Sequence, residues 1–344
     1  MSATELTATP LAQRTTLRLG GPARRLVVVD TEADLVEAVR TADAAGDPVL
    51  VLGGGSNVVI ADEGFDGLVV QVATRGVDRS SSELTVAAGE SWDALVASAV
   101  ADELAGIEAL SGIPGLVGAT PIQNVGAYGQ DVAQTITAVR VLQRSTGELR
   151  SMRPEDCGFS YRHSRFKGND QYVVLSVTFA LEPAPTSRPV RYAELAARLS
   201  VDVGGVAPLA DVRQAVLELR RAKGMVLDPG DHDTWSAGSF FTNPVMTRDD
   251  VDRLPADVPH WDEPDGRVKV SAAWLIEASG FGKGYGAGAA STVQVSSKHT
   301  LALTNRGSAR TADLLALARG IRDGVRDRFG VELAAEPVFV GCSL

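Results

Sequence analysis

Two glycine-rich loops are the parts of this sequence whose residue types best suit ligand binding. The first, Gly53-Gly54-Gly55-Ser56-Asn57, follows an apolar run, Pro48–Leu52, that predicts a buried strand. Backbone N–H groups of such a loop can converge on a phosphate, because glycine removes the side chains that would block its approach. The loop is not the G-x-G-x-x-G fingerprint, since Val58 stands at the third glycine, and it lacks the Gly-Lys-Ser/Thr of a Walker A loop. On its own it is better interpreted as a tight turn.

The second loop is longer and carries no charged side chain. It reads SGIPGLVGATPIQNVGAYG, from Ser111 to Gly129, and holds five glycines. A mobile surface loop of this length normally contains Lys, Glu or Asp. A neutral loop of glycines, small hydroxyls and amides instead suits the isoalloxazine ring and pyrophosphate of a flavin. The alternative is a buried connector between domains.

Composition and charge limit the classes of partner. The 344 residues include 33 Lys and Arg against 43 Asp and Glu, a net charge of −10 that argues against nucleic-acid binding. We expect no signal peptide and no membrane insertion, because no basic-then-apolar start and no run of roughly 18 apolar residues occurs. Cys157 and Cys342 form no CxxC motif and are expected to be free thiols in the cytoplasm. No metal is expected, since the histidines lack metal-site spacing: His163, His232, His260 and His299.

The elements that must position these loops alternate in the first third of the chain. Thr31 and Asp34 form a capping pair before a helix over 33–45, which Gly46 ends. Ser91 starts a second helix over 91–104. The predicted strands between them are Val27–Asp30, Pro48–Leu52, Gly67–Val72 and Leu84–Ala88.

After the second loop the pattern is typical of strands, at Thr135–Gln143 and Gln171–Leu181. The segment EPAPTSRP, Glu182–Pro189, has three prolines and indicates a stiff connector. Beyond it we expect helices over 210–224 and Thr311–Phe329, the latter stopped by Gly330, and a last strand at Val338–Val340. The pattern predicts an α+β protein with an N-terminal ligand-binding half and a separate C-terminal half.

Five segments together resemble one family, the UDP-N-acetylenolpyruvoylglucosamine reductases, also called UDP-N-acetylmuramate dehydrogenases. They occur in the family's order and spacing, and the resemblance covers nearly the whole chain. IPGxxGxxPxQNxGAYG and GSFFxNP are highly specific strings. The segments are TTLRLGGPAR (Thr15–Arg24), LGGGSNVV (Leu52–Val59), LSGIPGLVGATPIQNVGAYG (Leu110–Gly129), FSYRHSRFK (Phe159–Lys167) and AGSFFTNP (Ala237–Pro244), and SGFGKGYGAGAA (Ser279–Ala290) resembles a further glycine-rich segment.

The resemblance implies a two-part FAD-binding module of the vanillyl-alcohol-oxidase (PCMH) type plus a C-terminal α+β substrate-binding domain. We place these parts at residues 1–70, 71–205 and 206–344, with the last strand allowed to return to the FAD-binding module. It also implies one bound FAD and NADPH as co-substrate. The implied reaction reduces the enolpyruvyl group of UDP-N-acetylglucosamine-enolpyruvate to UDP-N-acetylmuramate, for peptidoglycan synthesis.

That reaction needs a fixed cation and a proton donor, because hydride addition leaves negative charge delocalised into the substrate carboxylate. By resemblance, Arg162 in SYRHSRFK is the arginine that binds the carboxylate, and Ser239 in AGSFF is the proton donor. Outside these motifs, a surface or phosphate-binding arginine and a strand hydroxyl would be the plainer interpretations. Glu336 matches the third catalytic residue, and its spacing to Gly341 supports it over Glu332.

The sequence departs from the family near Glu336. The family commonly reads Glu-Val-Arg-x-x-Gly, whereas this chain reads Glu336-Pro337-Val338-Phe339-Val340-Gly341. Val338 thus replaces an arginine, whose role must be met elsewhere or not at all.

The resemblance also implies substrate and cofactor residues. Tyr192 matches a tyrosine loop that closes over the UDP-sugar in one subtype of the family, and Lys223 matches a lysine near the diphosphate. Tyr161 and Asn243 complete the expected substrate set, while Lys298 and His299 lie nearby without a fixed register. The expected FAD-binding residues are Gly53, Gly54, Gly55, Ser56, Asn57, Ser111, Gly112, Ile113, Pro114, Gly118, Thr120, Ile122, Asn124 and Gly126.

Two other functions fit parts of the pattern. An FAD-linked oxidase of the same superfamily often tethers FAD through His or Cys, and neither residue occurs in these loops. A non-catalytic flavin- or nucleotide-binding protein is disfavoured by the Arg162 and Ser239 motifs. We therefore expect a monomeric, cytoplasmic enzyme whose partner is a small UDP-sugar.

Overall fold

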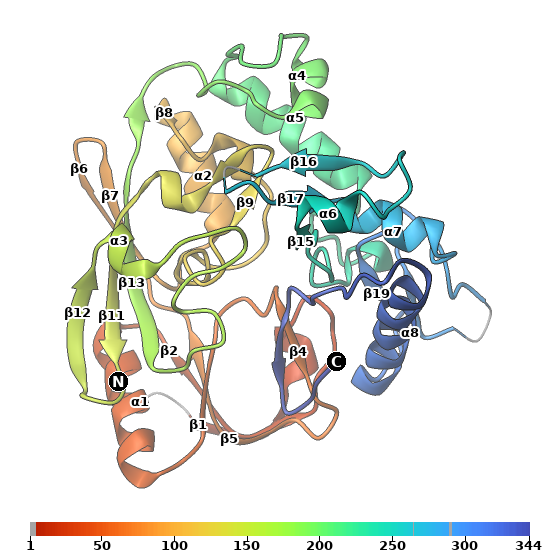
Figure 1. Ribbon diagram of the computed structural model, residues 1–344. Coiled ribbons are helices and arrows are strands. Elements are labelled where there is room, and N and C mark those ends of the chain that lie inside the picture. Colours follow the sequence, from red (N-terminus) through yellow and green to blue (C-terminus); the bar gives the residue numbers. More distant parts are fainter. Residues whose placement is uncertain (1–4, 264, 289–290) are drawn as a thin grey trace. The chain divides into compact units, whose positions relative to one another are not determined.

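The structure is a computed structural model that describes residues 5–263, 265–288 and 291–344 (Figure 1). Residues 1–4, at the start of the segment in which no signal peptide is expected, lie outside the described residues, as do 289–290 of the glycine-rich segment Ser279–Ala290. The chain forms two compact units. The N-terminal unit comprises Met1–Thr9, Ala23–Gly55 and Phe65–Val226, and the C-terminal unit comprises Pro10–Pro22, Ser56–Gly64 and Leu227–Leu344.

The N-terminal unit begins with a four-stranded sheet whose order is β1 (Glu5–Pro10), β2 (Pro22–Val29), β5 (Phe65–Val72) and β3 (Val49–Leu52). Helix α1 (Glu32–Ala45) packs on it through Leu35, Val36 and Val39. Thr31 Oγ1 accepts from Asp34 N at 3.0 Å, and Gly46 ends the helix at φ 71°, so the predicted cap and stop are confirmed.

A second, antiparallel sheet has the order β12 (Glu148–Met152), β11 (Ile136–Gln143), β13 (Tyr172–Ala180), β7 (Glu83–Ala87) and β6 (Val77–Ser80), with β12, β11 and β13 side by side at the left of Figure 1. Helix α2 (Trp92–Ala101) packs against it, with Trp92 5.8 Å from Phe179 between ring centroids. The helix ends before the predicted residue 104. The reason is that β8 (Leu104–Ala105) pairs with β14 (Glu182–Pro183), the start of the proline-rich connector.

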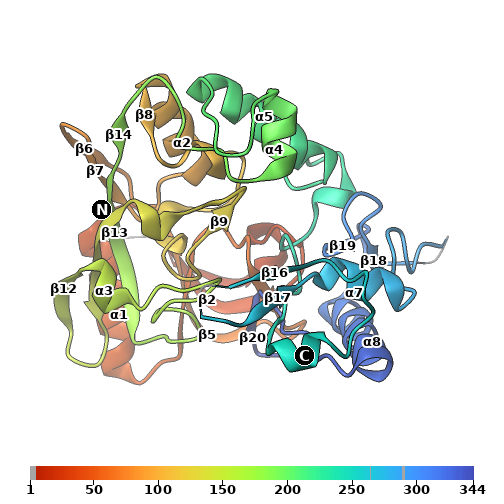
Figure 2. The same cartoon turned by 45° about the horizontal axis from the view of Figure 1, so that its top comes forward.

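Helices α4 (Ala193–Leu199) and α5 (Leu209–Ala222) lie side by side at the top of Figures 1 and 2, and α5 contacts α2. These contacts place the end of the N-terminal unit at Val226, beyond the expected boundary at 205, while the three-part division itself stays a prediction. The remaining short elements of this unit are η2 (Glu108–Leu110), η3 (Val117–Ala119), β9 (Gly126–Ala127), β10 (Gln130–Asp131), η4 (Val132–Gln134) and α3 (Pro154–Cys157).

The C-terminal unit is built around one apolar core, to which α8 (Thr311–Phe329) contributes one buried face. Leu314, Ala318 and Ile321 of α8 are fully buried. Strand β4 (Val58–Ile60), from the first third of the chain, pairs in parallel with β20 (Val338–Val340). The other elements are η1 (Leu11–Arg14), η5 (His232–Thr234), β15 (Val245–Met246), α6 (Arg248–Val251), β16 (His260–Asp262), β17 (Val268–Val270), α7 (Ala272–Ala278), β18 (Val293–Val295) and β19 (Leu303–Asn305).

Two glycines of helix α8, Gly320 and Gly324, allow a test of how the helix packs. Gly320 is exposed inside the helix, and a Cβ there meets no atom within 4 Å. Gly320→Ala is therefore expected to raise the free energy of unfolding by about 0.5–1 kcal/mol, because alanine restricts the unfolded chain. In the matched variant Gly324→Ala, the new methyl group must displace the Phe281 ring, so that gain is lost. Denaturant titration measures both; equal gains would mean that Phe281 does not pack there.

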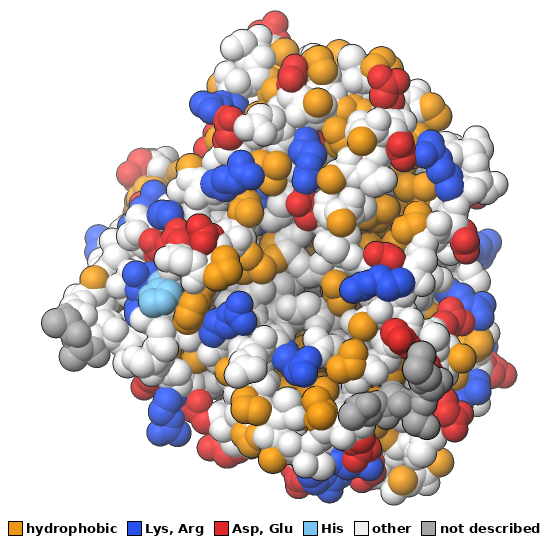
Figure 3. Space-filling view, turned by 180° about the vertical axis from the view of Figure 1, so that it is seen from behind, with side chains coloured by type: hydrophobic (Ala, Val, Ile, Leu, Met, Phe, Trp, Pro, Cys, Tyr) orange, Lys and Arg blue, Asp and Glu red, His pale blue; other side chains and the backbone are white. Residues whose placement is uncertain are grey.

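The described residues include no helix that is both long and apolar enough to cross a membrane. Basic and acidic side chains are interspersed over the face shown in Figure 3 rather than gathered by sign.

Candidate functional site

The two glycine-rich loops meet within the N-terminal unit. A Cβ built on Gly54 would lie 2.9 Å from Gly115 Cα, which no real side chain tolerates, whereas one on Gly53 would lie 3.6 Å from Leu116 Cδ1. Gly118 N donates to Ala88 O at 2.9 Å, and a Cβ on Gly118 would come within 2.5 Å of Ala88 Cβ. Glycine at these positions therefore lets two backbone segments and a strand end approach closely.

Three polar side chains of the second loop bond backbone groups of the protein, within the loop or in neighbouring segments. Ser111 Oγ donates to Glu108 O at 2.7 Å, and Thr120 Oγ1 donates to Val117 O at 2.8 Å. Asn124, at φ 46°, accepts from Ala133 N and donates to Ser160 O. These contacts engage the polar atoms of Ser111, Thr120 and Asn124 within the protein and fix the loop. A neutral cradle of glycine backbone fits a flavin cofactor better than one of charged side chains would.

Gly53 provides a test of this cradle. In Gly53→Ala the added methyl makes only ordinary contact with Leu116, so the fold and its thermal midpoint are expected to stay unchanged. FAD retention is expected to weaken by about tenfold or more, since one misplaced methyl in a close-packed site costs about 1–3 kcal/mol. Fluorescence titration of the apoprotein with FAD measures the dissociation constant, with Gly320→Ala as the control. Unchanged FAD affinity would remove Gly53 from the cofactor site.

Arg162 is held in a left-handed turn at φ 52°, with its guanidinium 5.6 Å from the centre of the Tyr161 ring. The β9–β10 hairpin lies beside it: a side chain on Gly126 would meet Arg162 Nη1 at 3.2 Å and Asp131 Cβ at 2.9 Å. Burial raises the pKa of Asp131, although Arg162 favours its ionised form. Asp131 Oδ1 is buried and has no hydrogen-bond partner among the described residues. The hairpin thus brings a carboxylate close to Arg162.

Tyr192 and Lys223 lie together in a second cluster of the same unit. Tyr192 packs edge-on against Tyr128, with 5.3 Å between ring centroids. Lys223 Nζ bonds Glu194 at 2.6 Å and lies 5.9 Å from the Tyr128 ring centre. Burial opposes the charge of Lys223, but the bond to Glu194 outweighs it, so the pKa of Lys223 is raised. The lysine therefore stays cationic at neutral pH.

Arg220 lies near the same cluster. Its Nη2 donates to Met225 O at 2.9 Å, while its Nε is buried with no hydrogen-bond partner among the described residues. Burial lowers the pKa of Arg220, and Tyr128 and Asp93 offset part of that effect. No signal in the sequence separates Arg220 from the exposed Arg221 beside it.

In the C-terminal unit, backbone hydrogen bonds join three distant segments around Ser239. Phe240 N donates to Leu301 O at 2.7 Å, and Glu336 N donates to Phe240 O at 2.9 Å. Phe240 and Phe241 are both 1% exposed and anchor the segment in the core. Ser239 therefore directly precedes a residue, Phe240, whose backbone is bonded to the segments of Glu336 and Leu301.

Glu336 and Asn57 are neighbours on this assembly. Glu336 is 9% exposed, and its backbone oxygen accepts from Asn57 Nδ2 at 3.4 Å. Val338 N donates to Asn57 O at 3.0 Å. Asn243, further along from Ser239, uses its Oδ1 to accept from Ala272 N at the start of α7. The last residue of the first glycine-rich loop is thus bound to the Glu336 segment.

Ser239 also has a side-chain partner. Its Oγ lies 3.4 Å from His299 Nε2, whereas the neighbouring Lys298 pairs with Asp231. The geometry therefore places His299 beside Ser239 and Lys298 beside Asp231, an assignment that the sequence pattern does not give. No group of His, Cys, Asp and Glu that could hold a metal ion occurs among the described residues.

Comparison with known proteins identifies the family. A family model described as FAD binding domain matches residues 23–153, and one described as UDP-N-acetylenolpyruvoylglucosamine reductase, C-terminal domain, matches residues 228–340. The chain is similar to the UDP-N-acetylenolpyruvoylglucosamine reductase of Saccharopolyspora erythraea, with 56% identity over 97% of this chain and 95% of the relative. The chain belongs to the UDP-N-acetylenolpyruvoylglucosamine reductase family.

Other relatives agree on the reductase family. The Thermobifida fusca reductase is 55% identical over 97% of this chain and 98% of its own. The crystal structure of the Thermus caldophilus reductase matches with a TM-score of 0.68 at 27% identity, covering 99% of both chains. The expected α+β class, with an FAD-binding module and a C-terminal domain, is confirmed. The chain is a flavoprotein oxidoreductase of the reductase family, which removes the oxidase and non-catalytic alternatives.

The expected site residues of this reductase fall into two groups. The N-terminal unit holds Gly53, Gly54 and Gly55, the second-loop residues, Tyr161, Arg162, Tyr192 and Lys223. The C-terminal unit holds Ser56, Asn57, Ser239, Asn243 and Glu336. Sequence reasoning missed Asp131 beside Arg162 and the partly buried Arg220, and it named His299 without placing it beside Ser239. Their roles, like those of the expected residues, stay predictions.

Proposed function

We propose that this chain catalyses the NADPH-dependent, FAD-mediated reduction of UDP-N-acetylglucosamine-enolpyruvate to UDP-N-acetylmuramate, a step of peptidoglycan precursor synthesis. The observation that carries the proposal is the joining of Ser239 and Glu336 on adjacent backbone segments of a chain that matches the reductases over 97% of its length. Bound FAD supplies the hydride, which it receives from NADPH. The chain's own residues must bind the substrate, stabilise charge and deliver a proton.

Arg162 is proposed to bind the substrate's enolpyruvyl carboxylate. Hydride addition places negative charge on the neighbouring carbon, and delocalisation into the carboxylate creates an enolate. A guanidinium suits this site because its planar fork can bond two oxygens at once. The turn at φ 52° and the contact with Tyr161 restrict the side chain before substrate arrives. Tyr161 accordingly acts beside it as a substrate-binding residue, and Glu336 as its catalytic partner at the carboxyl group.

Ser239 is proposed to give its hydroxyl proton to the carbon that carries the developing charge. A serine hydroxyl is a weak acid, so the step requires an enolate carbon that is far more basic than a carboxylate. The two buried phenylalanines that follow Ser239 fix its backbone and limit the directions its Oγ can take.

The UDP part of the substrate is assigned to Tyr192, Lys223 and Asn243. Lys223 is cationic and already paired with Glu194, so a diphosphate must compete with that carboxylate. Tyr192 is 43% exposed and rests on Tyr128, which leaves one face open for a nucleotide sugar. These local cations explain how a chain of net charge −10 can bind anionic ligands.

A stopped-flow experiment tests the proposal. Under anaerobic conditions NADPH is expected to bleach the flavin absorbance, and the enolpyruvyl UDP-sugar is then expected to restore it. One pocket serving both ligands in turn predicts ping-pong kinetics in the steady state. A protein that bleaches with NADPH but is not reoxidised by the enolpyruvyl sugar would contradict the proposed substrate. We also place the enzyme in the cytoplasm as a monomer, which fractionation and sedimentation velocity test.

A further inference from the structure

The contact between Ser239 and His299 raises the question of how the serine regains its proton. After each turnover Ser239 is left as an alkoxide, a strong base that cannot persist at neutral pH. Its Oγ lies 3.4 Å from His299 Nε2, within reach of a hydrogen bond. Imidazole is the side chain best able to exchange protons near pH 7. The arrangement therefore supplies what a weak serine acid lacks, a titratable proton source.

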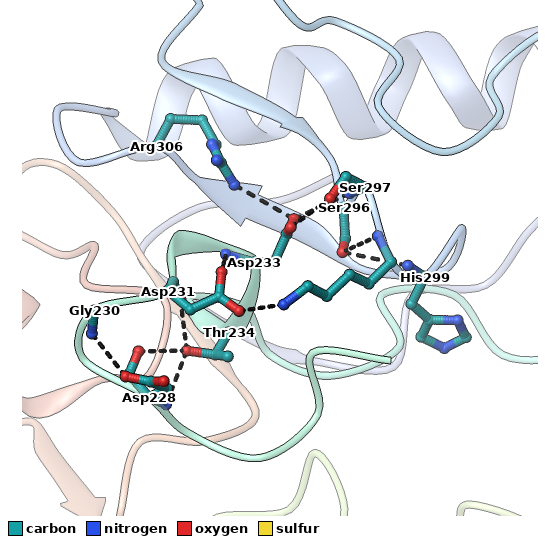
Figure 4. Close-up of polar contacts among 10 residues, drawn as sticks. Asp228, Gly230, Asp231, Asp233, Thr234, Ser296, Ser297, His299 and Arg306 are labelled. Atoms are coloured by element: carbon teal, nitrogen blue, oxygen red, sulfur yellow. Dashed lines mark hydrogen bonds and ion pairs between the residues drawn. The ribbon is translucent and has the colours of Figure 1, made fainter. Parts of the chain in front are cut away.

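Hydrogen bonds from within the turn and from the loop of Asp233 hold the turn that carries His299 (Figure 4). Ser296 Oγ accepts from Lys298 N at 3.0 Å and from His299 N at 3.3 Å. Asp233, on the loop that leads to Ser239, accepts from Ser297 N at 3.0 Å and from Ser297 Oγ at 2.5 Å. One carboxylate thus ties the turn of His299 to the loop that precedes Ser239.

The charge of Asp233 stabilises this connection. Burial opposes its ionisation, but hydrogen bonds from Ser297 and the charge of Arg306 outweigh it, so the pKa of Asp233 is lowered. Lys298, next to His299, pairs with Asp231 on the same loop. Two ion pairs, Lys298–Asp231 and Arg306–Asp233, therefore connect the segments before Ser239 to the segments around His299.

We propose that His299 is a proton relay that reprotonates Ser239 during reduction of the enolpyruvyl group. The inference rests on the proposed function and adds a positioning residue to it. In the step, the Ser239 O–H bond breaks as its proton forms a C–H bond with the substrate carbon. The serine oxygen takes a proton from Nε2 of the His299 imidazolium, which becomes neutral imidazole and regains a proton from solvent. Each broken O–H or N–H bond leaves its electron pair on the oxygen or nitrogen, so the relay changes no oxidation state.

The relay predicts that the rate of flavin reoxidation decreases as pH rises. The imidazolium is the competent form, so the reoxidation rate of the wild type is expected to fall as pH rises through a histidine pKa, near 6.5 when unperturbed. Charged groups on the segments packed against His299 set the final value. They are Lys298 on its own turn, Glu277 bonded to Thr300, Glu336 beyond Phe240, and Asp231, Asp233 and Arg306.

The decisive variant is His299→Gln, which keeps a hydrogen-bond donor for Ser239 but cannot titrate. Flavin reduction by NADPH is expected to keep its wild-type rate, while reoxidation by the enolpyruvyl sugar slows by about 10- to 100-fold. The pH dependence of reoxidation between about pH 5.5 and 8.5 should disappear in this variant. The matched control is His260→Gln, whose exposed histidine lies on β16.

The outcomes distinguish a proton relay from a histidine that only supports the fold. A slow His299→Gln variant that keeps the wild-type pH profile would show a merely structural role and overturn the relay. So would wild-type reoxidation that does not depend on pH in this range. Restoration of the His299→Ala rate by added imidazole would support the relay independently. If the wild-type flavin is never reoxidised by the enolpyruvyl sugar, the proposed function fails, and the relay fails with it.

Discussion

Ser239→Ala is expected to slow flavin reoxidation by the enolpyruvyl substrate by about 10²- to 10⁴-fold, the range for losing a positioned general acid. Reduction of the flavin by NADPH should keep its wild-type rate, since that half-reaction needs no proton on the substrate carbon. We expect the loss to be chemical in origin, because the backbone hydrogen bonds of the next residue, Phe240, do not depend on the Ser239 side chain.

Stopped-flow absorbance of the flavin under anaerobic conditions measures the two half-reactions separately. Ser308→Ala is the matched control, because Ser308 is an exposed serine in the same unit. If Ser239→Ala slowed both half-reactions equally, Ser239 would be a structural residue and the proton-donor assignment would be wrong.

Arg162→Lys is expected to lower the reoxidation rate by about 10²- to 10³-fold, the cost of removing one oriented donor from an oxyanion. Lysine keeps the charge but cannot bond two carboxylate oxygens in one plane. The strain of the turn at φ 52° is similar for both residues, so the comparison isolates the shape of the cation. Binding of the enolpyruvyl sugar should weaken in parallel.

The same stopped-flow assay, run over a range of substrate concentrations, yields the limiting rate and the apparent dissociation constant. Arg165→Lys, at an exposed position on the same loop, is the control. Normal turnover by Arg162→Lys would transfer the carboxylate-binding role to another cation, and Arg220 would then be the first to examine.

Local signals predict those elements whose ends are set by neighbouring residues. Thr31, Asp34 and Gly46 define α1 because caps and stops act within one turn. The predicted end of α2 is wrong by a few residues, because the β8–β14 pair draws residues 104–105 into a strand. The residues around 104–105 do not predict this pairing, because the partner strand, β14, lies far away in the sequence.

The site shows the same division. Motif strings predict Arg162, Ser239 and the glycine-rich loops as site residues, because each motif is a run of consecutive residues. The contacts of His299 with Ser239 and of Asp131 with the Arg162 region join residues that are distant in sequence, so only the folded chain shows them. The placement of Pro10–Pro22 and Ser56–Gly64 in the C-terminal unit also escapes prediction. Contacts such as Thr311 Oγ1 to Ile60 O at 2.6 Å account for it.

The parallel pairing of β4 with β20 has a consequence for biosynthesis. Asn57 and Glu336 are bonded across 279 positions of chain, so this contact cannot form until translation has passed the last strand. Pairings of such long range are slow to form, because the entropy cost of closing the intervening loop comes before any stabilising contact is made. The segment Ser56–Gly64 therefore remains without its partner strand until Val338–Val340 has been synthesised.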